Sequence, residues 1–126
     1  MIIDHCRDVE ELKKLYNDRP MPNQYEFDWL IHNPNLFCFY DEDFGYLRGF
    51  ITVQDEEIEN IGKVLTLSGT SIRKNLPNII TAINKVCDAF HKDIYSYTPL
   101  KEAAYVLKKA NFRKIGTNLY MRFKNG

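Results

Sequence analysis

Residues of the types that bind anions follow a short apolar run near the middle of the chain. Val64, Leu65 and Leu67 favour a strand that Ser68 and Gly69 close. Polar and basic residues come next, and the candidate site comprises Leu67, Ser68, Gly69, Thr70, Ser71, Arg73, Lys74 and Asn75. The first N–H groups of a helix have no intrahelical partner, so a glycine-containing turn that leads into one is typical of an anion site.

The helix that must follow this turn is indicated by apolar residues spaced three and four apart. Its buried stripe would be formed by Leu76, Ile79, Ile80, Ile83, Val86, Cys87 and Phe90. Asn84, Lys85 and Asp88 fall on the opposite, polar face. The stretch 63–91 therefore predicts a strand, a turn and a long amphipathic helix.

Two further helices precede this unit, and one follows it. Asp8 is placed to cap the first, with Glu11 completing a capping box, and Asn23 with Glu26 repeats that pattern before Trp29. The last helix would begin at Thr98-Pro99 and end at Asn111, a residue that tolerates a left-handed backbone.

The other apolar and aromatic runs predict strands. They cover 1–5, 36–40, 46–53 and 94–97, with a final hairpin within 113–124. Asp41 to Gly45 reads as a hairpin loop, Gly49 as a bulge, and Gln54 to Asn60 as an acidic turn. The resulting order, β-α-α-β-β-β-α-β-α-β-β, predicts one α/β domain over 1–126. Its mixed, mostly antiparallel sheet would carry helices on both faces.

The composition limits the classes of function. The net charge is zero, but residues 1–60 hold 5 basic and 14 acidic side chains, whereas residues 61–126 hold 12 and 3. This split has two interpretations: facing or opposed surfaces of one fold, or a positive surface for a phosphorylated ligand or an acidic partner. No membrane span, signal peptide, metal-ligand spacing or nucleic-acid motif is visible. Three scattered cysteines favour reduced thiols in a cytoplasm.

The last third of the chain carries a family resemblance. The helical segment through Ala103, Leu107 and Ala110, followed by Asn111-Phe112, resembles the helix of the GNAT (GCN5-related N-acetyltransferase) superfamily that ends in Gly-Phe before the final hairpin. Asn111 stands in place of the glycine. The order of elements extends this resemblance over nearly the whole chain. It implies acetyl-CoA as cofactor, gripped by the turn after the fourth strand, and an amine as acceptor.

The turn departs from the family pattern. A Gln/Arg-x-x-Gly-x-Gly/Ala motif is expected there, but Gly69 is the only glycine, and Pro77 removes one N–H from the first turn of the helix. The resemblance therefore implies an acyl-CoA site only if Arg73 and Lys74, with Ser71 and Thr70, replace the lost backbone contacts.

The resemblance also suggests catalytic candidates. The tyrosine that protonates the leaving thiolate in the family would fall at Leu107, so Tyr105 and Tyr97 are the alternatives. A general base would come from Glu56, Glu57 or Glu59, because this topology places the acidic run near the cleft, or from His91 at the end of the long helix. Glu56 and Glu57 are the two assigned to this role.

Two functional hypotheses follow. The first is an acyl-CoA-dependent N-acetyltransferase with a degenerate pyrophosphate loop. The second is a non-catalytic, bacteriophage-encoded protein that serves as a virion component or binds a host protein. The second is based on Leu67-Ser68-Gly69, Arg73-Lys74 and 107–109, which resemble small GNAT-like proteins of tailed phages. Either protein would act in the cytoplasm or a virion. A second copy of the chain is among the partners considered, and nucleic acid is not expected as one.

Overall fold

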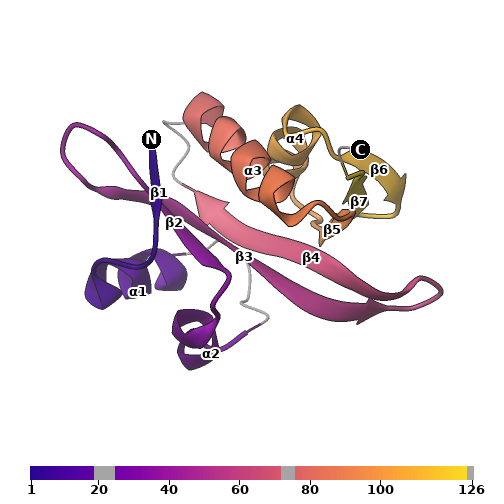
Figure 1. Cartoon of the computed structure of the whole chain (residues 1–126), viewed down its shortest axis with the longest axis horizontal. Coiled ribbons are helices and arrows are strands. Elements are labelled where there is room, and N and C mark those ends of the chain that lie inside the picture. The colour runs from indigo at the N-terminus through magenta and orange to yellow at the C-terminus, as the bar shows by residue number, and fades with distance from the viewer. Residues whose placement is uncertain (19–24, 72–75, 125–126) are drawn as a thin grey trace.

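The computed structural model describes residues 1–18, 25–71 and 76–124. Its elements follow the predicted order (Figure 1). They are β1 (Ile2–Asp4), α1 (Val9–Asn17), α2 (Phe27–His32), β2 (Leu36–Tyr40), β3 (Leu47–Ile58), β4 (Gly62–Ser71), α3 (Leu76–Phe90), β5 (Ile94–Tyr97), α4 (Lys101–Lys109), β6 (Arg113–Gly116) and β7 (Leu119–Arg122).

The seven strands form one sheet in the order β1-β2-β3-β4-β5-β7-β6. β4 and β5 run parallel, joined by α3 as crossover, and every other neighbouring pair is antiparallel. Figure 1 shows α3 and α4 on one side of the sheet and α1 and α2 on the other. The predicted fold class, a mostly antiparallel α/β sheet with helices on both faces, is confirmed.

Each face of the sheet carries its own hydrophobic core. The larger core lies under α3 and α4 and includes Ile51, Val53, Leu67, Ile94 and Leu107. The smaller core lies under α1 and α2, and its strand residues include Leu36, Cys38, Leu47 and Phe50. Residues of odd number in the second half of β3 therefore face α3, and those of even number face α1 and α2.

β3 and β4 are longer than the sequence predicts. The acidic turn expected from Gln54 to Asn60 is wrong as far as Ile58, because β3 continues to that residue and pairs with β4 throughout. The turn expected at Ser68-Gly69 is also wrong, since β4 continues to Ser71. The two strands thus form a long antiparallel ribbon that extends beyond the rest of the sheet (Figure 1).

Position 69 within this ribbon is a glycine because the backbone of β3 leaves no room there for a side chain. A Cβ atom at this position would lie 2.2 Å from the carbonyl oxygen of Phe50 and 2.8 Å from the Cα of Ile51. Close backbone approach is one of the two reasons for which a strand tolerates glycine, the other being a bulge. The sequence shows the glycine, but not which reason applies.

A bulge falls beside Gly49, where one was predicted. Phe39 pairs with Gly49, but Tyr40 pairs with Leu47, so Arg48 is an extra residue in β3. As a result Leu47 and Phe50, three positions apart, both pack into the core under α1 and α2.

The helix ends match the sequence in part. Asp8 caps α1 by accepting from the N–H groups of Glu10 (3.0 Å) and Glu11 (3.3 Å). The Glu11 carboxylate, expected to complete a capping box, instead accepts the N–H of Leu47 at 3.0 Å. Glu26 itself stands at the N-cap of α2, and Asn23 is outside the described residues.

The last helix begins later than predicted and ends as predicted. α4 starts at Lys101, and the Thr98 hydroxyl accepts the N–H of Leu100 (3.1 Å) ahead of it. Asn111 has a φ of 71°, the left-handed conformation expected after a helix.

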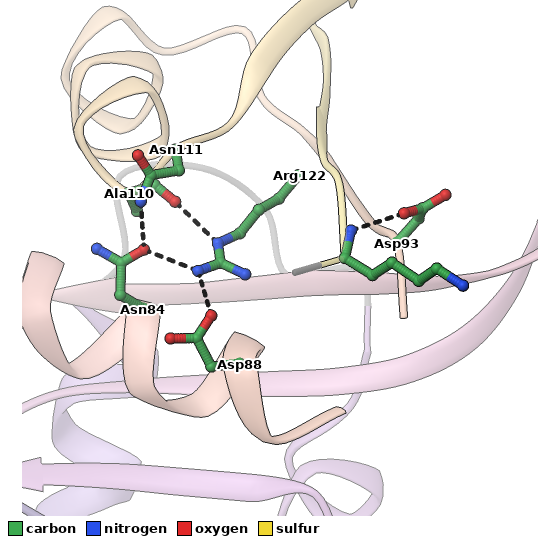
Figure 2. Close-up of polar contacts among 7 residues, drawn as sticks. Asn84, Asp88, Asp93, Ala110, Asn111 and Arg122 are labelled. Carbon is green, nitrogen blue, oxygen red and sulfur yellow. Dashed lines mark hydrogen bonds and ion pairs between the residues drawn. The ribbon is translucent and has the colours of Figure 1, made fainter. Parts of the chain in front are cut away.

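A buried guanidinium joins α3, α4 and β7. Arg122 is 4% exposed, and its Nε donates to the carbonyl of Ala110 (3.1 Å) at the end of α4. Its Nη2 donates to Asn84 Oδ1 (3.2 Å) and pairs with Asp88 (2.7 Å), both on α3 (Figure 2). One side chain thereby satisfies a helix-terminal carbonyl and holds two helices against the sheet.

All three cysteines are free thiols. Cys38 and Cys87 are buried, and their burial raises the pKa of each to about 12. Cys6 is partly buried, and burial raises its pKa as well.

Candidate functional site

A row of polar side chains crosses β3 and β4 on the face toward α1 and α2. The hydroxyls of Thr52 and Ser68, paired across the strands, share a hydrogen bond of 2.9 Å. One rung further on, Gln54 Nε2 donates to Thr66 Oγ1 at 2.8 Å. Thr52, Gln54 and Thr66 are each less than 10% exposed. Buried polar groups normally have partners, and here most of the partners are within the row.

Gln54 has a fixed orientation and one unsatisfied atom. Its Nε2 also approaches Glu56 Oε1 at 3.4 Å, so a flipped amide would place an oxygen against a carboxylate. With the amide held this way, Gln54 Oε1 is buried without a hydrogen-bond partner among the residues that the structure describes. Leaving a buried acceptor unsatisfied costs roughly 1–3 kcal/mol.

Two aromatic residues cover the end of the row. The Tyr25 hydroxyl donates to Glu56 Oε1, and its ring stacks on Trp29 with centroids 3.9 Å apart. Tyr16 of α1 donates its hydroxyl to the Tyr25 carbonyl, which fixes the backbone there. Burial, and secondarily the bond to Glu56, raises the pKa of Tyr25 well above its ordinary value. The Tyr25 hydroxyl thus stays protonated and keeps donating to the carboxylate.

The row lies where the parallel strands cease to pair. β5 pairs with β4 at Leu65 and Thr66 only, although β4 continues to Ser71 and β5 to Tyr97. On the next rung the Ser96 hydroxyl donates to the Leu67 carbonyl at 2.7 Å, in place of a backbone bond. Beyond that bridge, one edge of β4 is not paired with β5.

Of the two glutamates predicted as bases, the structure places only Glu56 in this row. Glu57 is exposed on the opposite face of β3, in register with Lys63. Adjacent residues of a strand point to opposite faces, which the acidic-turn prediction did not consider.

The two candidate tyrosines lie in different layers. Tyr97 ends β5 and is 65% exposed, on the same face as Tyr95 and hence as Thr66. Tyr105 lies on α4, which covers the opposite face, and the Lys109 ammonium is 5.7 Å from its ring centroid. Leu107 is buried in the larger core.

The candidate cofactor residues fall into two groups. Leu67, Ser68, Gly69, Thr70 and Ser71 belong to β4 rather than to a turn. The Leu67 side chain is in the larger core and its carbonyl accepts from Ser96. Arg73, Lys74 and Asn75, the expected anion ligands, lie outside the described residues.

Sequence reasoning did not identify Gln54, Thr66, Tyr25 or Trp29 as site residues. A signal was present, since polar residues alternate with apolar ones at Thr52, Gln54 and Glu56. That period of two favours a strand with one polar face. At the start of β4 and β5, a surface cavity of about 270 Å³ is lined by Asp55, Lys63, Val64, Leu65, Lys92, Asp93 and Tyr95, and no residue of the row contributes to it. None of the described helices is long and apolar enough to cross a membrane.

Comparison with known proteins identifies the fold. No protein-family model matches the chain, and no curated protein matches its sequence. Among solved structures, a mutant of the spermidine N-acetyltransferase SpeG from Vibrio cholerae is similar, with a TM-score of 0.69 and 15% identity, over 98% of this chain and 95% of that chain.

Two further solved structures are also similar. The NatB acetyltransferase complex bound to CoA and MES matches with a TM-score of 0.64 and 9% identity, over 99% of this chain and 100% of that chain. GCN5 from Tetrahymena matches with a TM-score of 0.62 and 11% identity, over 99% and 97%. The chain therefore has the fold of the GNAT acetyltransferases.

Proposed function

We propose that this protein is an N-acyltransferase that moves an acyl group from acyl-CoA to an amine. The observation that carries the proposal is the end of β4–β5 pairing at Thr66, beside the polar row on a GNAT fold. Where β5 no longer covers it, a strand such as β4 can bind an extended, amide-containing ligand such as the arm of CoA through backbone N–H and C=O groups. The NatB structure, which has this fold, was solved with CoA.

The thioester of acyl-CoA supplies the activated acyl group. β4 ends at Thr70 and Ser71, before α3, and Arg73 and Lys74, which come next but one in the sequence, are the residues we assign to the pyrophosphate. The loop is degenerate because it has a single glycine, which is within the strand. Its affinity for the anion must then come from those two cations rather than from a glycine-rich backbone.

Glu56 is the residue that we assign to the proton of the amine. A protonated amine cannot attack a carbonyl carbon, so a base must first remove its proton, here through a water molecule. Glu56 lies in the polar row, whereas Glu57 faces away. For the leaving thiolate we assign Tyr97, because it ends β5 on the same face as the row, and α4 carries Tyr105 on the other. The amine nitrogen gains the acyl group as the C–S bond breaks.

The phage-protein alternative has no support from the structures named above, which are acetyltransferases. The buried Leu107, which replaces the expected acid, does not exclude an enzyme, because Tyr97 at the end of β5 offers a hydroxyl on the face of the polar row.

Calorimetric titration with acetyl-CoA tests the proposal. We expect micromolar affinity for the wild type and a loss of at least tenfold in Arg73→Ala/Lys74→Ala, because two cations leave the site. Lys13→Ala/Lys14→Ala removes the same charge from exposed positions on α1 and should bind as the wild type does. An absence of heat at millimolar acetyl-CoA, or equal losses in both double variants, would refute it. Release of CoA thiol in the presence of a panel of amines then measures turnover.

A further inference from the structure

The side chain of Gln54 offers an acceptor that none of the described residues uses. Gln54 is 7% exposed, its amide nitrogen is committed to Thr66 and Glu56, and its Oε1 lacks a partner among the described residues. A buried acceptor in this state is suited to an N–H or O–H donor that a ligand brings. The chemistry around it determines which donor fits.

The groups around this oxygen select positive charge. Glu56 presents a carboxylate on the same face, and its Oε1 already accepts from Tyr25, whose ring stacks on Trp29. A carbonyl oxygen, a carboxylate and aromatic rings together match an alkylammonium group, which donates N–H bonds and is attracted to ring faces. An anion would be repelled by Glu56. A neutral ligand without donors would leave Gln54 Oε1 unsatisfied.

We propose that Gln54, Glu56 and the Tyr25–Trp29 pair form the acceptor subsite, and that the acceptor is an aliphatic amine bound as its ammonium ion. This inference rests on the proposed function, since it names the amine that receives the acyl group. Gln54 acts as a specificity residue that accepts an N–H bond from the substrate, and Glu56 then takes the proton. Since Gln54 Oε1 is buried, the amine reaches it only when a covering side chain moves. Trp29 is 37% exposed and is therefore an accessible part of that cover.

Trp29 is the only tryptophan of the chain, so its fluorescence reports on this subsite directly. The probe is 1,4-diaminobutane, titrated without acetyl-CoA, and the control ligand is 1,4-butanediol, which has the same length and no charge. We expect a saturable change in emission with the diamine and none with the diol.

Three variants test the residues. Glu56→Gln, which is isosteric, and Gln54→Met, which removes the amide, should each weaken diamine binding by at least about tenfold. Glu57→Gln removes the same charge from the opposite face of β3 and should bind as the wild type does. If Gln54→Met does not fold, the difference in diamine affinity between Glu56→Gln and Glu57→Gln still tests the subsite. Equal binding of diol and diamine, or equal affinities in the two glutamate variants, would overturn the inference.

Failure of the acceptor subsite can be distinguished from failure of the proposed acyl transfer. If acetyl-CoA binds and amines are acylated, but Glu56→Gln leaves diamine binding unchanged, the subsite is wrong and the enzyme remains. If the diamine binds as described but acetyl-CoA does not, the proposed transfer is wrong and the chain is an amine-binding protein. Turnover adds a further readout: Gln54→Met should raise KM for the amine and leave the affinity for acetyl-CoA unchanged.

Discussion

Replacing Arg122 by methionine tests how much the guanidinium shown in Figure 2 contributes to stability. Methionine keeps much of the apolar stem and removes the three contacts of the charged end. The Ala110 carbonyl then loses a buried donor, which costs roughly 1–3 kcal/mol. The lost pair with Asp88 adds at most about 1 kcal/mol, because the Asp88 side chain is 50% exposed and solvent screens it. We therefore expect Arg122→Met to lower the free energy of unfolding by about 2–3 kcal/mol.

Urea-induced unfolding followed by circular dichroism measures this difference, and the melting temperature should fall by roughly 10 °C in a chain of this length. Arg113→Met is the matched control, since Arg113 is exposed on β6 and should cost less than about 0.5 kcal/mol. Asp88→Asn keeps an acceptor oxygen and should cost less than about 1 kcal/mol. An Arg122→Met protein as stable as the Arg113→Met protein would show that the buried guanidinium is not stabilising α3 and α4.

Three more predictions concern the strands and the thiols. Gly69→Ala should cost about 2–3 kcal/mol in the same unfolding assay, because its Cβ would overlap the Phe50 carbonyl; a change below 0.5 kcal/mol would mean that the ribbon separates without cost. Ser96→Ala should cost about 1 kcal/mol and speed amide hydrogen exchange in β5, since the Leu67 carbonyl loses its donor; unchanged exchange would contradict that role. With a thiol-reactive chromogenic disulfide, the native protein should release one equivalent, from Cys6, and three after unfolding. The rate at Cys6 should rise with pH as its thiolate forms, and rapid reaction of all three thiols in the native protein would contradict the burial of the other two.

The sequence predicted an element correctly where a local pattern of residues was enough to determine it. β2 and β5 have the bounds predicted, because each is a short apolar or aromatic run between clear breakers. Asn111 was predicted as left-handed from its place after a helix, and the backbone agrees. In each case the relevant physics is local, within a few residues of chain.

The predictions were wrong where contacts between residues far apart in the sequence determine the structure. Charged residues lower β-propensity, yet β3 continues through Glu57, because it pairs with β4 as far as Ile58 and places Glu57 in register with Lys63. Gly69 reads as a turn residue, but the approach of the Phe50 carbonyl gives it a place inside a strand. The polar row depends on the register of β3 against β4, and the position of Tyr25 over Glu56 depends on a contact across 31 residues.

The bulge at Arg48 changes which face of the sheet the side chains of β3 point to, and it separates two parts of the strand. The part before it contacts α1, and the part after it carries the polar row. Upstream of it, Leu47 points toward α1, and its N–H is held by Glu11. Downstream, Phe50 to Glu56 set the alternation that builds the polar row. Deleting Arg48 would therefore leave a regular ladder in which Leu47 stands two positions before Phe50, on the same face, and would remove the ion pair of Arg48 with Asp41. Gln54 should not move, because its rung pairs with β4. An insertion or deletion in the hairpin between β2 and β3 can accordingly be accommodated at this bulge, so that the pairing of β3 with β4 from Phe50 onward does not change.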